Sequence, residues 1–211
     1  MNGNLPGLSP LAARVHGSAL ALAPVLLLCS TIAFIYEGGI NDGVVGGTIG
    51  VWSTFALGIG FVGLFRTLEP ASPRLMPVLL PVAVIAFTAG AMFNVQAMYL
   101  AAYGNDLLTD ITEGGAADIA PIGVFAFLPW GLLAPLTFVL TGLLLWRTRT
   151  APKSTAALLV LGGLLFVASR PERIEPLALA ADATLILALV PLGWSLATGR
   201  HPTPRTASAP A

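Results

Sequence analysis

One ionisable residue of this sequence, Asp182, lies inside a long apolar stretch, where a charge is expensive and marks either a function or a partner. It follows Pro176 by six residues, which on a helix places it about 9 Å below the end of that stretch. Arg170 and Arg173 come just before the stretch, and a long arginine side chain can reach down to a shallow carboxylate. Two interpretations stay open. Asp182 either binds a ligand, couples to an ion or relays a proton, or it forms a structural ion pair or helix-to-helix hydrogen bond.

Asn94 and Gln96 are the other deep polar residues. Two positions apart on a helix, they point about 200° apart and cannot serve one site together. Asn94 shares its face with Gly90 and other small residues, which favours close contact with another helix. It lies about 12 Å below the end of its own apolar segment, close to the depth of Asp182. We therefore predict a hydrogen bond between Asn94 and Asp182.

Trp52, Ser53 and Trp130 reach a comparable depth on two further segments. They could line an outward-facing pocket with Asp182 at its base, or the two tryptophans could instead fill the core of a bundle. The candidate ligand-binding or ion-coupling residues are Asp182, Asn94, Ser53, Trp52, Trp130, Arg170 and Arg173.

Motifs for the usual membrane chemistry are missing from the sequence. His16 and His201 both lie at the margins of apolar segments, so a bis-histidine haem site is not expected. The sequence has no HExxH motif and no nucleophile elbow, and the single Cys29 excludes a cysteine-built metal site. We expect no catalytic residue, no metal site and no cofactor.

The elements that must position these residues are membrane helices. With 56% hydrophobic residues, 9% charged residues and a mean hydropathy of +0.86, the chain is far outside the range of soluble domains. A helix needs roughly 20 apolar residues to cross a bilayer. Six segments qualify or come close: 17–36, 43–65, 76–102, 122–146, 154–169 and 177–198. The fifth is short, since sixteen residues span only about 24 Å.

The few charges are segregated between alternate connections of these segments. Basic residues stay on the cytoplasmic side of short loops. The basic residues on one side are Arg14, Arg66, Arg74, Arg147, Arg149, Lys153, Arg200 and Arg205. The acidic residues on the other side are Glu37, Asp42, Asp106, Asp110, Glu113, Asp118, Glu172 and Glu175. Arg170, Arg173 and Glu69 are the exceptions. The pattern predicts an all-α, polytopic membrane protein, a six-transmembrane-helix bundle with its N-terminus and C-terminus cytoplasmic.

Within this organisation, residues 1–16 form a cytoplasmic N-terminal segment, 17–199 the transmembrane domain and 200–211 a disordered cytoplasmic tail. The predominance of arginine over lysine, with much Ala, Gly and Pro, is associated with GC-rich bacterial genomes. The expected location is therefore the bacterial cytoplasmic (inner) membrane. Since the net charge is zero and no basic stripe occurs, we expect the lipid bilayer and no nucleic acid as a partner.

The segment 43–65 is rich in glycine, and Gly46 and Gly50 form a GxxxG pair suited to close helix crossing. This helix is a candidate interface for a homo-oligomer or a membrane-complex partner. The leading functional hypothesis is a non-enzymatic accessory subunit or small-ligand binder with a polar site in the outer half of the bundle. The alternatives are a small-solute or proton-coupled transporter acting as an oligomer and, third, a membrane-embedded enzyme.

Overall fold

The computed structural model describes residues 8–103 and 131–199, and these form helices joined by short turns, with no β-strand among them. In chain order the helices are α1 (Pro10–Glu37), α2 (Val44–Leu68), the 3-10 helix η1 (Glu69–Ala71), α3 (Met76–Tyr103), α6 (Leu133–Thr148), α7 (Lys153–Ser169) and α8 (Glu175–Ala197). The prediction of an all-helical bundle is confirmed for this part of the chain. The predicted tail 200–211, the outer acidic loop and the first part of the segment 122–146 lie outside the described residues.

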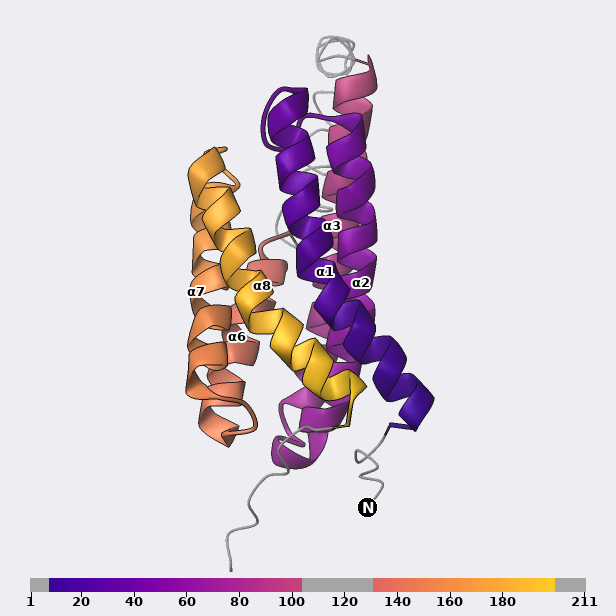
Figure 1. Ribbon diagram of the computed structural model, residues 1–211, viewed down its shortest axis with the longest axis vertical. Helices are drawn as coiled ribbons and strands as arrows, with labels where there is room; N and C mark the ends of the chain where they lie inside the picture. The colour runs from indigo at the N-terminus through magenta and orange to yellow at the C-terminus, as the bar shows by residue number, and fades with distance from the viewer. Residues whose placement is uncertain (1–7, 104–130, 200–211) are drawn as a thin grey trace, which may run out of the picture.

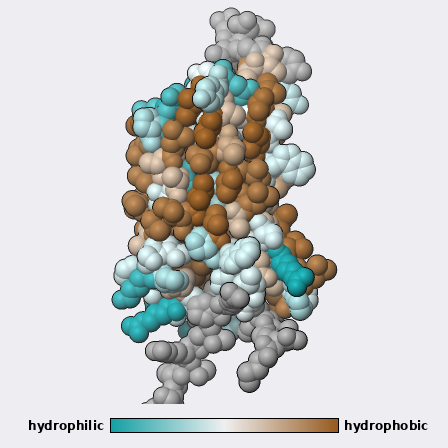
Figure 2. Space-filling view, in the orientation of Figure 1, coloured by the Kyte–Doolittle hydropathy of each residue, from teal (hydrophilic) through white to brown (hydrophobic). Residues whose placement is uncertain are grey.

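Within residues 8–103 and 131–199, four helical stretches are long and apolar enough to cross a membrane: α1, α2 continued by η1, α3 and α8. The two remaining apolar helices, α6 and α7, have 16 and 17 residues. At helical rise α7 is about 26 Å long, slightly less than a typical hydrocarbon core. Figure 2 shows a hydrophobic belt between more polar ends on the face in view.

The helices alternate in direction along the chain, so the connections fall at two ends of the bundle (Figure 1). The turns α1–α2 and α7–α8 lie at one end, which we call the acidic end. The turns α2–α3 and α6–α7 lie at the other, the basic end, together with the start of α1 and the finish of α8. This arrangement is the one that the charge pattern predicts.

Helix α1 begins before the apolar segment does, because Ser9 and Pro10 form a favourable helix start. The Ser9 side chain accepts a hydrogen bond from the backbone nitrogen of Ala12 at 3.2 Å, and Pro10 needs no such partner. Pro24 lies inside α1 and removes one backbone hydrogen bond there. The helix changes direction along its length (Figure 1).

Helix α2 begins against the last residue of α1. The Glu37 carboxylate accepts hydrogen bonds from the backbone nitrogens of Val45 at 3.0 Å and Gly46 at 2.8 Å. A side chain on Gly43 would overlap this carboxylate. The negative charge therefore satisfies free backbone groups at the positive end of the α2 dipole.

The glycines of α2 pack inside the chain. A Cβ on Gly46 would overlap the ring of Phe34 in α1, and one on Gly47 would overlap Met98 in α3. Without side chains at these positions α2 lies close to both neighbours, as expected for small residues in membrane bundles. The prediction that this helix also carries an oligomer interface stays a prediction.

The basic half of the bundle is closely packed. Leu64, Phe65, Leu68 and Leu145 are at most 1% exposed. Phe61 sits above them, with its ring centroid 5.7 Å from that of Phe138. A cavity between these helices lies nearer the acidic end.

Candidate functional site

Three polar side chains, from α1, from α8 and from the residue that follows α7, meet near the acidic end, and we call them the polar triad: Thr31, Arg170 and Asp182. Arg170 Nη2 donates to Asp182 Oδ1 at 3.0 Å and to Asp182 Oδ2 at 3.1 Å. It also lies 2.8 Å from Thr31 Oγ1, which in turn donates to Asp182 Oδ2 at 2.5 Å. The triad joins α1 and α8 to the end of α7.

Burial makes these contacts necessary. Asp182 and Thr31 are 0% exposed, and the Arg170 side chain is 14% exposed. A buried carboxylate is tolerated only with a compensating charge and hydrogen bonds. Arg170 follows directly after α7, so its long side chain can run across Phe166, with the guanidinium carbon 4.8 Å from the ring centroid.

The prediction that an arginine next to the apolar stretch reaches Asp182 is confirmed for Arg170. Arg173 does not join the triad. It is exposed in the α7–α8 turn, in a left-handed backbone conformation with φ of 53°.

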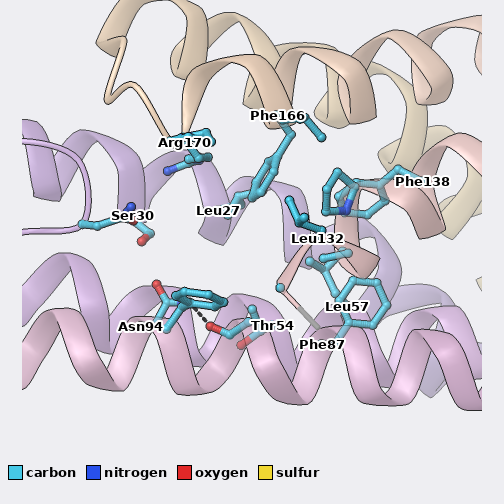
Figure 3. Close-up of a pocket in the computed structure, with 18 of the residues that line it drawn as sticks. Leu27, Ser30, Thr54, Leu57, Phe87, Asn94, Leu132, Phe138, Phe166 and Arg170 are labelled. Carbon is cyan, nitrogen blue, oxygen red and sulfur yellow. Dashed lines mark hydrogen bonds between the residues drawn. The ribbon is translucent and has the colours of Figure 1, made fainter. Parts of the chain in front are cut away.

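A cavity of about 260 Å³ adjoins the triad, between α1, α2, α3, α6 and α7 (Figure 3). Its walls are mostly apolar and include Leu57, Phe87, Phe138 and Phe166. Arg170 lines the cavity, whereas Asp182 does not appear among the described lining residues. The arginine thus presents the triad to the cavity, and the carboxylate lies behind it.

Ser30 and Asn94 also line the cavity, at the same end as Arg170 (Figure 3). Ser30 Oγ donates to the carbonyl of Gly46 at 2.7 Å. Asn94 Nδ2 donates to the carbonyl of Gly90 at 2.8 Å. A Cβ on Gly50 would overlap the Asn94 amide, so the missing side chain of Gly50 is what admits Asn94.

The predicted hydrogen bond between Asn94 and Asp182 is wrong. Asn94 bonds within its own helix, and Asp182 bonds to Thr31 and Arg170. The reason is the helix arrangement. Helix α3 packs against α2 and α6, whereas α8 packs against α1 and α7, so equal depth does not make the two residues neighbours.

The predicted placement of Trp52 is also wrong, both as a pocket residue and as core filler. Trp52 is 64% exposed on the surface of α2, where its ring stands edge-on to Phe55 at 6.1 Å. Ser53, one position on, is fully buried and donates to the carbonyl of Ala23 in α1 at 2.9 Å, away from the cavity. The glycine face of α2 turns inward and therefore turns the tryptophan outward. Trp130 lies outside the described residues.

Sequence reasoning missed Thr31 and the phenylalanine walls. The signal for Thr31 was present, because Ser30 and Thr31 are adjacent hydroxyl residues in an otherwise apolar helix. Phenylalanines in an apolar sequence carry no comparable signal, since core, cavity and lipid-facing positions all accept them.

Metal binding has no support in the part of the chain that is described, where no three His, Cys, Asp or Glu residues cluster. The arrangement can instead hold a molecule with an apolar body and present a guanidinium to its polar group. Comparison of the chain with protein-family models, with curated proteins and with solved structures finds no match.

Proposed function

We propose that this protein is a non-enzymatic, multi-pass protein of the bacterial inner membrane that binds a small, mostly apolar molecule inside its helix bundle. In this proposal all six helices cross the bilayer, the termini are cytoplasmic and the acidic end faces outward. The segregation of charges and the hydrophobic belt of Figure 2 support this orientation.

The observation that carries the proposal is the cavity beside the polar triad. Its described lining combines apolar walls with the guanidinium of Arg170 at the outer end, which is the usual composition of a small-molecule site. At about 260 Å³ it suits a molecule of one or two rings rather than a lipid or a peptide.

The packing favours a binder over a transporter. Below the cavity, Phe61, Leu64 and Phe65 fill the bundle and are at most 1% exposed. A transporter would need a second opening toward the basic end, through this closely packed region. Catalysis is less favoured still, because both carboxylate oxygens of Asp182 are occupied by Arg170 and Thr31.

Filling the cavity tests the proposal. We expect 1-tetralone, a neutral bicyclic ketone, to bind the protein in lipid nanodiscs at one molecule per chain above the background of empty nanodiscs, measured by equilibrium dialysis. Ala134→Trp places a large side chain in the cavity wall and should abolish this binding. Leu143→Trp, on the 54% exposed face of the same helix, is the matched control and should bind normally. Equal binding by both variants would refute the site.

Cysteine labelling of intact cells tests the orientation. In a Cys29→Ser background, a membrane-impermeant maleimide should label Asp42→Cys, which is exposed at the acidic end. It should label Ser154→Cys, exposed at the basic end, only after the cells are permeabilised. The opposite pattern would reverse the proposed topology.

A further inference from the structure

Arg170 uses only one of its three nitrogens within the described structure. Its hydrogen bonds to Asp182 and Thr31 all come from Nη2. Its Nε is buried and has no hydrogen-bond acceptor among the described residues. Nε has almost no accessible surface, and Nη1 takes no part in the hydrogen bonds to Asp182 and Thr31. The guanidinium that lines the cavity therefore keeps donor capacity for a molecule bound there.

The charge of the triad limits what that molecule can be. Asp182 lies 3.0 Å from Arg170 and compensates its positive charge. A bound anion would place a second negative charge beside one guanidinium in apolar surroundings, and no second cation lines the described part of the cavity to balance it. A bound cation would face the guanidinium directly. Only an uncharged acceptor gains the hydrogen bond without leaving a net buried charge.

The walls limit the rest of the molecule. The Phe138 ring lies 6.0 Å from that of Phe87 and 6.3 Å from that of Phe166, measured between centroids. These rings come from α3, α6 and α7 and line the same cavity as Arg170 (Figure 3). At these spacings the three rings pack against one another and form one aromatic wall of the cavity, and a flat ring is suited to pack against such a wall.

We propose that the ligand is an uncharged ring compound with a carbonyl oxygen, such as a ketone, quinone or cyclic amide, and that this oxygen accepts a hydrogen bond from Arg170. This inference rests on the proposed function and names the chemical class of its ligand. The carboxylate of Asp182 lies on the other side of Arg170 from the ligand. Its negative charge balances the guanidinium, and the site therefore disfavours anions.

Four probes with the same bicyclic body test the ligand class on the unmodified protein in nanodiscs. They are 1-tetralone, tetralin without a polar group, 2-naphthoate and 2-naphthylmethylammonium. After correction for partition into empty nanodiscs, we expect 1-tetralone to bind about tenfold more tightly than tetralin, as for one added hydrogen bond. Both ions should bind more weakly than the ketone.

A charge variant tests the role of Asp182. Asp182→Asn removes the counter-charge and leaves the guanidinium, so the preference should change from 1-tetralone to 2-naphthoate. Thr184→Val, a half-buried position on the same helix whose hydroxyl bonds only to the carbonyl of Ala180, is the matched control and should keep the ketone preference. If Asp182→Asn does not fold, the probe series on the unmodified protein decides alone.

The outcomes separate this inference from the proposed function. Tighter binding of 2-naphthoate by the unmodified protein, or equal binding of 1-tetralone and tetralin, overturns the ligand class while the cavity remains a binding site. If no probe binds above the background of empty nanodiscs, both the ligand class and the binding site are overturned. The same holds if Ala134→Trp does not reduce the binding that is measured.

Discussion

Helices α1 and α8 meet at two places, and the two contacts use opposite chemistry. Near the basic end, backbone meets backbone: a Cβ on Gly17 would overlap Ala197, and one on Gly193 would lie 2.5 Å from the nitrogen of Ala21. Near the acidic end, Thr31 and Asp182 meet through hydrogen bonds completed by Arg170. The first contact depends on the absence of side chains, and the second depends on having all of its side chains.

This difference predicts different sensitivities. The glycine contact should fail when volume is added, because close-packed backbones have no room to relax. The triad should fail when one partner is removed, because a buried charge is then left alone.

The largest effect is expected from Arg170→Ala. It leaves the fully buried Asp182 with Thr31 as its remaining partner, and we expect the free energy of unfolding to fall by about 3–5 kcal/mol. Replacing both members, Arg170→Leu with Asp182→Leu, should recover most of this loss because no buried charge remains. Unfolding by SDS titration measures both values. A double variant as unstable as the single one would contradict the explanation.

Gly17→Ala should follow, with a loss of about 1–3 kcal/mol from overlap with α8. The control is Gly58→Ala, whose Cβ would find its nearest neighbour, Phe87 Cβ, at 3.8 Å. The same SDS titration should find this control close to the parent protein. Since alanine has the higher helix propensity, a loss of equal size in both variants would show that the close contact with α8 is not its cause.

Thr31→Val probes the neutral member of the triad. The shape is nearly kept, but Asp182 and Arg170 each lose one hydrogen bond, so we expect about 1–2 kcal/mol of destabilisation. Thr184→Val, whose hydroxyl bonds only its own helix at the carbonyl of Ala180, should change stability by less than about 0.5 kcal/mol. Comparable thermal stabilities of the two variants would exclude a role for Thr31 in holding the triad.

The smallest effect is expected from Glu37→Gln at the start of α2. The glutamine keeps one oxygen acceptor but loses the charge at the helix dipole, which is worth about 0.3–1 kcal/mol at an exposed site. The difference from the parent protein should shrink when the SDS titration is repeated at high salt. A loss that does not depend on salt would point to the hydrogen bonds instead of the charge.

The sequence was sufficient for the directions of the helices and for the contact between Arg170 and Asp182. Charged residues indicate where each helix ends and on which side of the bundle each connection lies. An arginine that breaks this pattern next to a buried acid indicates an ion pair between the two. It was insufficient for Asn94 and Trp52, because their positions depend on which face of each helix turns inward. In a membrane protein both lipid and core accept apolar side chains, so hydropathy does not reveal that face. The role of Thr31 could not be predicted from the sequence, because its partners are 139 and 151 residues away along the chain and only the fold brings them together.

Pro24 lies between the two places at which α1 meets α8. Gly17 is seven residues before it and Thr31 seven residues after it, and the proline cannot donate the backbone hydrogen bond that would make the helix rigid at that point. Helix α1 therefore consists of two helical segments with a weak point between them at Pro24, and each segment has its own contact with α8. A ligand that displaces Arg170 and Thr31 would therefore tilt the segment after Pro24, while the segment before it stays packed against Ala197 and Gly193.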